Sequence, residues 1–256
     1  TSSMEEKTDW QRSEAFDSEL AKDYWNIEHD TEQAVEVANG ALNFIFADGG
    51  EPNGDDDLEV GIDYGRTLPM DEDWQVVLDG VYATNVLNGF DVEFELQVEE
   101  MGFECELDFD SYDNIRRIGV EVSQQSAGGY QSAYASVSAS ADEPLQGPVS
   151  IRVRHNVAVR ELLFEYQPDG ATNWTELARL DLESGDFRGT NRTGSQLIGE
   201  LVSTSQRMSV EIDAEAGQAT QLGYLEIGGI EIGSYTPPVW ELYDDFSVSA
   251  LDTQKW

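Results

Sequence analysis

The sequence predicts an all-β protein, a two-sheet antiparallel sandwich, from three observations. Apolar and polar residues alternate in roughly a dozen short segments, the pattern of strands with one buried face. Glycine, proline and asparagine signals separate these segments, and no persuasive helical period of apolar residues interrupts them. Sheets that bury one face pack in pairs around a shared core, so we expect a sandwich.

The first elements in chain order are a short strand at residues 14–16 and a hairpin around Asn39-Gly40. Residues 92–98 give the clearest alternation, with one apolar and one acidic face. We expect loops at residues 47–57 and 185–195 and a turn at Pro168-Asp169-Gly170. The other expected strands are residues 60–64, 74–78, 105–109, 118–122, 151–154, 162–166, 174–182, 208–212 and 222–232.

The opening segment of the fold occurs twice. Trp10 and Trp240 are each followed six residues later by Phe, then by Leu, and then by Trp five residues after Leu. Only the gap from Phe to Leu differs, being four residues in the first copy and five in the second. A period of about 230 residues indicates a whole domain in tandem rather than a solenoid repeat.

We therefore divide the chain into a lead-in (1–9), one sandwich (10–236) and a final part (237–256). The final part holds a Pro-Pro linker and then the first strand of a next repeat or an inter-subunit strand. An isolated apolar strand invites aggregation, so we expect it to pack on the preceding domain or to complete a neighbouring copy by strand addition. Its candidate assembly residues are Trp240, Phe246, Leu251 and Trp256.

The composition narrows the possible partners. The formal net charge is −38, from 52 acidic and 14 basic residues, so the chain repels nucleic acid and anionic membranes. No apolar run is long enough to insert into a membrane. Adaptation to high salt and carboxylate clusters for Ca²⁺ both explain such acidity, and the near-absence of lysine favours the halophilic explanation. The single Cys105 rules out an internal disulfide.

Two segments carry a family resemblance. Phe16-Asp17, Leu20 and Trp25, followed by a hairpin that ends in residues 39–42, resemble the start of concanavalin A-like lectin/glucanase domains, including the laminin-G-like ones. Residues 148–182 are similar to a further hairpin of that superfamily, with alternating arginines, then Tyr166, Asp169-Gly170 and Trp174. The resemblance covers nearly all of residues 10–236 and implies a jelly-roll β-sandwich, but a fold does not specify a function.

The candidate catalytic residues are Glu106, Asp108 and Asp110, because alternation puts all three carboxylates on one face of a strand. A retaining glycosidase needs two carboxyls about 5–5.5 Å apart. The segment resembles the Glu-x-Asp-x-x-Glu strand of laminarinase-type members, but Asp110 stands where the acid/base Glu is expected and the spacing is one residue short. A solvated acidic face explains the same pattern, so we expect no enzymatic activity.

Calcium is the expected cofactor, as a structural ion. A glycine-rich loop offers the hard oxygen ligands that Ca²⁺ prefers, although a solvated charge run is the alternative. Members of the resembled superfamily commonly hold calcium near the first strand, which implies further ligands from Glu14 and Asp17. The loop ligands would be Asp48, Glu51, Asp55, Asp56 and Asp57.

Two kinds of glycan contact are also predicted. Asn173 and Asn191 begin N-glycosylation acceptor triplets in loops, which agrees with a glycoprotein outside the cell. Trp74, Tyr130 and Tyr134 have polar neighbours and are candidates for a sugar-stacking platform, with core packing as the alternative.

The expected function is a non-catalytic, extracellular module of a repetitive cell-surface protein, either an adhesin-like stalk or a filament subunit that assembles head to tail. Its partners would be copies of itself, adjacent repeats and surface glycans. A tandem array favours this function because repetition gives avidity from weak contacts. The alternatives are a carbohydrate-binding module of a secreted protein and a glucanase-like glycoside hydrolase.

Overall fold

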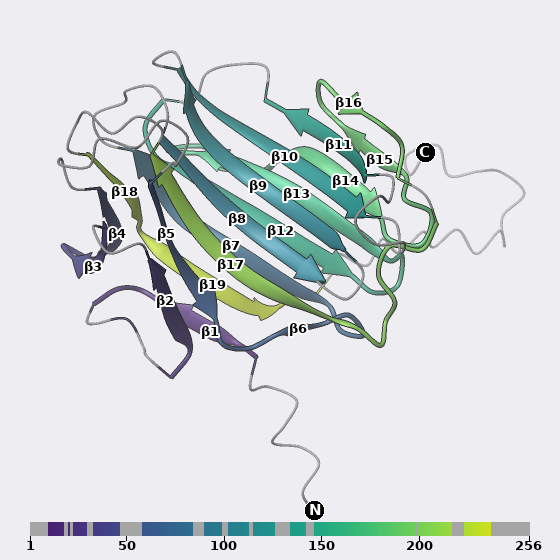
Figure 1. Cartoon of the computed structure of the whole chain (residues 1–256), viewed down its shortest axis with the longest axis horizontal. Coiled ribbons are helices and arrows are strands. Elements are labelled where there is room, and N and C mark those ends of the chain that lie inside the picture. The colour runs from purple at the N-terminus through teal and green to yellow at the C-terminus, as the bar shows by residue number, and fades with distance from the viewer. Residues whose placement is uncertain are drawn as a thin grey trace, which may run out of the picture.

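The computed structural model describes residues 10–17, 20, 23–29, 33–46, 58–83, 90–98, 102–112, 115–125, 134–141, 146–197, 199–216 and 223–236. These residues form strands and no helix, in two antiparallel sheets, which confirms the predicted all-β sandwich (Figure 1). Within these ranges no helix is long and apolar enough to cross a membrane.

The first sheet has ten strands. Eight of them follow one path across the sheet, in the order β15 (Phe187–Gly189), β14 (Thr175–Asp181), β13 (Glu161–Pro168), β12 (Val149–Asn156), β7 (Trp74–Ala83), β18 (Gly223–Ile227), β4 (Ala41–Phe46) and β3 (Gln33–Ala38). Off this path, β19 (Gly229–Ser234) pairs with β7, and β1 (Arg12–Glu14) pairs with β19.

The second sheet has nine strands. Their order is β16 (Thr193–Gly194), β11 (Tyr134–Ser140), β10 (Ile115–Gln125), β9 (Phe103–Tyr112), β8 (Phe90–Val98), β17 (Arg207–Ala216), β5 (Leu58–Tyr64) and β2 (Trp25–His29), and β6 (Leu68–Pro69) pairs with β17. Strands that are neighbours here lie far apart in the sequence, as β8, β17 and β5 do. This non-local pairing aligns outward-facing side chains from distant segments.

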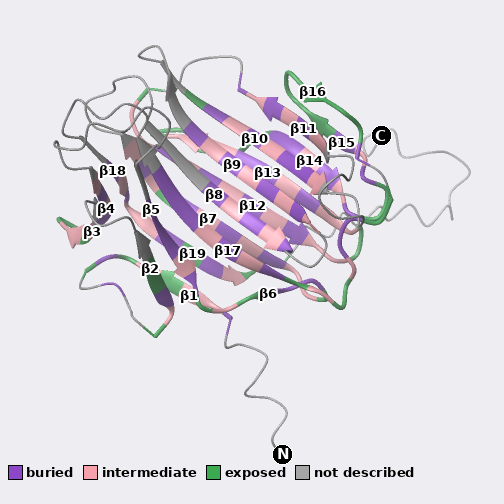
Figure 2. Cartoon of the chain, viewed as in Figure 1, coloured by how far each residue is buried: buried purple, intermediate pink, exposed green. Residues whose placement is uncertain are grey.

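The core forms between the apolar faces of the two sheets. In β12 every second residue is buried, and the same alternation runs through the central strands, as the purple and pink bands of Figure 2 show. The buried apolar side chains of both sheets belong to one continuous cluster. Each fully buried Leu, Ile, Val or Phe contributes about 1.5–3 kcal/mol, so this cluster fixes which face of each strand points outward.

Two predicted turns are confirmed. Asn39 and Gly40 have φ of 57° and 78° and join β3 to β4, as a two-residue hairpin loop with two left-handed residues requires. Gly170 has φ of 76° in the turn between β13 and β14, where the Ala171 amide donates to the Pro168 carbonyl at 3.0 Å. Both turns set the strand register on either side of them.

Some expected boundaries were wrong. The first strand ends at Glu14, because Phe16 has φ of 52°, a left-handed conformation outside the extended range of regular strand residues. The expected strand at residues 222–232 is two strands, which separate at a bend where the Gly228 amide donates to the Asp79 carbonyl at 2.7 Å. The expected loop at residues 185–195 contains the short strands β15 and β16.

Candidate functional site

Carboxylates line the outer side of the nine-stranded sheet. On β8, β9 and β17 acidic residues alternate with buried apolar residues, so the acidic side chains share the side that points away from the core. We call this side the carboxylate face. The residues that define it are Asp63, Glu95, Glu104, Glu106, Asp108, Glu121, Glu211 and Asp213.

Five of these carboxylates form a row that crosses five adjacent strands. In the strand register Glu121 lies opposite Glu106, Glu106 opposite Glu95, Glu95 opposite Glu211, and Glu211 opposite Asp63. Directly opposed residues have Cβ atoms about 4.5–5.5 Å apart, and like charges at that separation repel. The burial of the apolar face beneath them therefore has to overcome this repulsion.

Glycines make room for carboxylates in the next row. Asp213 is only 5% exposed and lies over Gly61 of β5, where an added Cβ would be 1.8 Å from the Asp213 Oδ1 atom. Asp108 lies over Gly119 of β10 in the same way, with its Oδ2 atom 3.1 Å from an added Cβ. The space above these glycines lets each carboxylate lie flat against the sheet.

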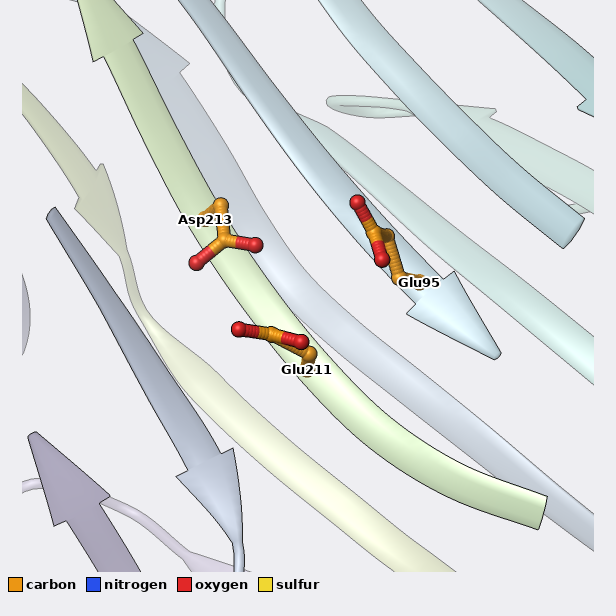
Figure 3. Close-up of side chains that lie close together, drawn as sticks. All are labelled: Glu95, Glu211 and Asp213. Atoms are coloured by element: carbon orange, nitrogen blue, oxygen red, sulfur yellow. The ribbon is translucent and has the colours of Figure 1, made fainter. Parts of the chain in front are cut away.

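Three carboxylates of the face converge. Figure 3 shows Glu211 and Asp213 on β17 and Glu95 on β8, and one oxygen atom from each lies within 4.8 Å of the others. A Ca²⁺ ion binds oxygen ligands at about 2.3–2.6 Å, so these three residues could share one ion as part of its shell. The Gln97 side-chain amide also donates to Glu95. Among the described residues, this is the group of three acidic side chains whose oxygen atoms lie this close together.

The predicted catalytic candidates lie on this face. Glu106 and Asp108 are half-buried on β9 and point outward, alternating with the buried Cys105, Leu107 and Phe109, which confirms the predicted alternation. Asp110 belongs to the same strand and pairs in register with Arg117 of β10, but its side chain lies outside the described residues. The sequence pattern did not reveal that residues of β5, β8 and β17 join them.

The predicted calcium ligands are only partly described. Asp48, Glu51, Asp55, Asp56 and Asp57 lie outside the described residues. Asp17 is exposed, whereas the Oε1 atom of Glu14 accepts hydrogen bonds from Arg12 Nε at 2.5 Å and from Trp25 Nε1 at 3.3 Å. The Glu14 carboxylate therefore binds side chains of the protein itself and links β1 to Trp25 of β2.

The predicted sugar platform was wrong at Trp74. Its side chain is 0% exposed, and its indole Nε1 donates to the Pro69 carbonyl at 3.0 Å. Trp74 alternates in phase with the buried Val76 and Leu78, so its polar sequence neighbours are simply the outward residues of the same strand. Tyr130 lies outside the described residues, and Tyr134 begins β11 with a side chain that is not described.

The two glycosylation acceptors are both exposed. Asn173 lies in the turn before β14, and Asn191 lies between β15 and β16 with φ of 50°. A bulky glycan requires such surface positions, so the structure leaves both sequons accessible for modification.

The outer side of the ten-stranded sheet has different chemistry. Arg152 and Arg154 of β12 both bind the buried Glu165 of β13, at 2.8 Å and 2.6 Å, so the charge of Glu165 is neutralised across the two strands. The Arg152 guanidinium also lies 4.0 Å from the Trp174 ring centroid, and that of Arg154 lies 4.6 Å from the Tyr235 centroid. Burial lowers the pKa of Arg152, while Glu165 opposes this effect. The Trp174 and Tyr235 rings therefore each pack against an arginine of this chain.

Comparison with known proteins identifies solved structures of similar fold. The sequence matches no protein-family model and no curated protein. A legume lectin-like domain from Entamoeba histolytica has 9% identity and a TM-score of 0.51, with 84% of this chain and 91% of that chain covered. SCLam, a non-specific endo-β-1,3(4)-glucanase from family GH16, has 9% identity and a TM-score of 0.55, with 86% and 89% covered.

A third structure agrees with these two. It belongs to the endo-acting O-glycanases that members of the human gut microbiota express to initiate mucin breakdown. It has 13% identity and a TM-score of 0.56, and the match covers 88% of this chain and 99% of that chain. The chain has the concanavalin A-like jelly-roll fold. The concanavalin A-like sandwich predicted from Phe16-Asp17, Leu20 and Trp25 with the two hairpins is thereby confirmed as a fold. A fold does not specify a function, so the function has to be argued from the two outer faces of the sandwich.

Proposed function

We propose that this concanavalin A-like sandwich is a non-catalytic, extracellular adhesive module that binds glycans through its carboxylate face. The observation that carries the proposal is the row of five carboxylates, from Glu121 to Asp63, across adjacent strands. Each carboxylate offers two acceptor oxygens, and hydrogen bonds from hydroxyl groups to a charged acceptor are stronger than those to a neutral one. A row of such acceptors suits an extended chain of hydroxyl donors.

The charge of the face selects the class of glycan. Sulfated or uronate-rich chains would be repelled, whereas neutral and amino-sugar chains donate hydrogen bonds or carry a complementary charge. Recognition by these eight side chains would be polar, because a carboxylate accepts hydrogen bonds and offers no ring to stack on a sugar. Sugar binding has precedent in this fold: the lectin UEA-II is complexed with galactose, and lectin I from Ulex europaeus with the methyl glycoside of α-L-fucose.

A glycan array followed by calorimetry tests the proposal. Glu106→Gln combined with Glu211→Gln keeps the side-chain shape, removes two charges from the row, and should weaken binding of a neutral or amino-sugar glycan about tenfold or more. The same variant should unfold at an equal or higher temperature, because like-charge repulsion is relieved. The matched control is Glu226→Gln on β18, in the other sheet.

Two results would overturn this function. One is unchanged affinity in the Glu106→Gln/Glu211→Gln variant, and the other is an array on which only sulfated or uronate-rich glycans bind. Because the variant is expected to be stable, loss of binding through unfolding is distinguished by its melting temperature.

A hydrolase is the second candidate, favoured by one observation. Glu95, Glu211 and Asp213 have oxygen atoms within 4.8 Å of each other, near the separation of about 5–5.5 Å between the carboxyls of retaining glycosidases. The test is release of reducing ends from β-glucans and mucin-type O-glycans by the purified chain. Turnover that disappears in Glu95→Gln or Glu106→Gln would make the module an enzyme and overturn its non-catalytic assignment.

A further inference from the structure

The first copy of the duplicated segment occupies a defined place in the fold. Its apolar side chains are buried, with Trp10 and Phe16 each 4% exposed and Leu20 9% exposed. Between them β1 pairs antiparallel with β19, where Arg12 lies opposite Ile232 and Glu14 opposite Ile230. We call this place the β19 seat, meaning the edge of β19 at residues 230–232 that pairs with β1, together with Tyr64 and Trp25.

Two hydrogen bonds complete the β19 seat. The Tyr64 hydroxyl donates to the Trp10 carbonyl at 2.9 Å. The Trp25 indole donates to the Glu14 carboxylate at 3.3 Å. The first copy thus fills the seat with a buried tryptophan, a carboxylate four residues later that accepts from Trp25, a buried phenylalanine two residues after that, and then a buried leucine.

The second copy repeats this pattern in sequence. The residues that correspond to Trp10, Glu14, Phe16 and Leu20 are Trp240, Asp244, Phe246 and Leu251, with one additional residue before the leucine. The positions that change side-chain character are those the seat does not bury. Ser13 and Ala15 are exposed and become Tyr243 and Asp245, and the half-buried Arg12 becomes Leu242. Identity between the two copies thus follows burial.

The last residues of β19, which lead toward the second copy, lie beside the start of the first copy. The Gln11 side chain donates to Ser234 Oγ at 2.5 Å, so the first copy starts next to the last residue of β19. The Tyr235 amide then continues the pairing by donating to the Asp73 carbonyl at 3.3 Å. If Leu242 replaced Arg12 opposite Ile232, residues 235–239 would form the connection. Hairpin connections of up to five residues are common, and β1 already runs antiparallel to β19 as a hairpin requires.

We propose that residues 240–251 are a second occupant of the β19 seat and dock there, within the same chain, when residues 10–20 leave it. A segment tethered so close to its site has an effective concentration in the millimolar range, which favours the same chain over a second copy. The two segments compete for one edge. Whichever segment is displaced presents its Trp, Phe and Leu to a partner, which is how one sandwich could engage the next.

Substitutions in the full chain test this competition. Trp240→Ala with Phe246→Ala should leave the melting temperature unchanged, because residues 10–20 fill the seat. Trp10→Ala with Phe16→Ala should lower it, and all four substitutions together should lower it about two times as far. Residues 242–244 should gain amide-exchange protection in the Trp10→Ala/Phe16→Ala variant. If the four-residue variant melts where the two-residue variant does, the proposal is wrong.

A second measurement covers the case in which the Trp10→Ala/Phe16→Ala variant does not fold. A synthetic peptide of residues 240–256 is added to the wild-type chain, with a control peptide in which Trp240 and Phe246 are alanine. The first peptide should accelerate amide exchange of β1 and the control should not. Equal effects of the two peptides would overturn the proposal. A dimer of the variant chain that grows with concentration would overturn the same-chain occupant, since it would put residues 240–251 in the seat of a second copy.

Discussion

His155 is a buried imidazole at the core side of β12. It is 1% exposed, its Nδ1 lies 2.8 Å from the Glu72 carbonyl oxygen, and its ring centroid is 5.3 Å from that of Trp74. Burial lowers its pKa below the ordinary value, while the Glu72 carbonyl and the Asp73 charge oppose the shift. The folded protein therefore favours neutral His155.

Acid should destabilise the fold through this residue. Below about pH 6.5 the unfolded chain binds a proton that folded His155 resists, so stability falls by up to about 1.4 kcal/mol per pH unit until the lowered pKa is reached. Urea unfolding from pH 7.5 to 5 measures this fall. A His155→Gln variant should show a flatter profile than the wild type. Identical profiles for wild type and His155→Gln would contradict the assignment.

Cys105 provides a reporter of unfolding. The thiol is 1% exposed in β9, and burial raises its pKa well above the ordinary value, so little reactive thiolate is present. We expect a thiol reagent to modify the native chain only at the rate of global or local opening. Rapid stoichiometric labelling without denaturant would show that β9 opens in the native state.

At the scale of elements, β5 and β17 pair closely because Gly61 lies opposite Asp213. Gly61→Ala should destabilise the protein by about 1–3 kcal/mol, since the new methyl would occupy the place of the Asp213 carboxylate. In an Asp213→Ala background the same change should cost much less, and denaturant unfolding of the four chains measures the coupling. Gly233→Ala is the control, because its nearest atom would be 3.7 Å away. Additive effects would mean that Asp213 moves freely aside.

Individual strands were predictable where the inward and outward residues differ strongly. Phe94 and Leu96 alternate with Glu93 and Glu95, and the expected strand matches β8 closely. β11 was not expected, because its serines and alanines offer little contrast between its two faces. The predictions that Phe16 lies in a strand and that Trp74 is exposed failed for a related reason. The left-handed conformation of Phe16 and the inward direction of the Trp74 side chain depend on packing that the neighbouring residues in the sequence do not encode.

The candidate site was less predictable than the strands. Glu106 and Asp108 could be selected from local alternation alone. Glu95 follows from the pairing of the consecutive strands β8 and β9, but the alignment with Glu211 and Asp63 depends on pairing of β17 with β8 and β5, which lie more than a hundred residues away in the sequence, and no local pattern specifies that register. The acidic strands were therefore predictable from the sequence, whereas the strand order that aligns their carboxylates on one face of the sheet was not.

At the scale of the whole molecule, the net charge of −38 makes the fold sensitive to ionic strength. Raising salt from 0.1 M to 1 M shortens the screening length from about 10 Å to about 3 Å, which is less than the spacing of opposed carboxylates. We expect the melting temperature to rise steadily with NaCl, as differential scanning calorimetry would show. Glu106→Gln/Glu211→Gln should show a smaller rise, and a melting temperature independent of salt would count against the halophilic interpretation.

Calcium stays a prediction with a direct test. An ion that binds only the folded state raises stability, so a chelator should lower the melting temperature and added Ca²⁺ should restore it. Mg²⁺ at the same concentration controls for screening, because it demands a tighter octahedral shell. Asp55→Asn with Asp56→Asn in the glycine-rich loop, compared with Glu211→Gln in the carboxylate face, would show which cluster holds the ion. An unchanged melting temperature in chelator would remove calcium from the description.

The hydrogen bond between Gln11 and Ser234 has a mechanical consequence. Gln11 precedes β1 and Ser234 ends β19, so the two strands begin and end side by side. Tension applied through the residues before β1 and after β19 would therefore act on the same end of this antiparallel pair. Their bonds would open one after another, like a zipper, while the two sheets carry no shear load. In a force-extension experiment the first event should be the low-force peeling of residues 10–20, followed by a stronger event when the sandwich itself yields. A pull on this protein would therefore empty the β19 seat before it damages the fold.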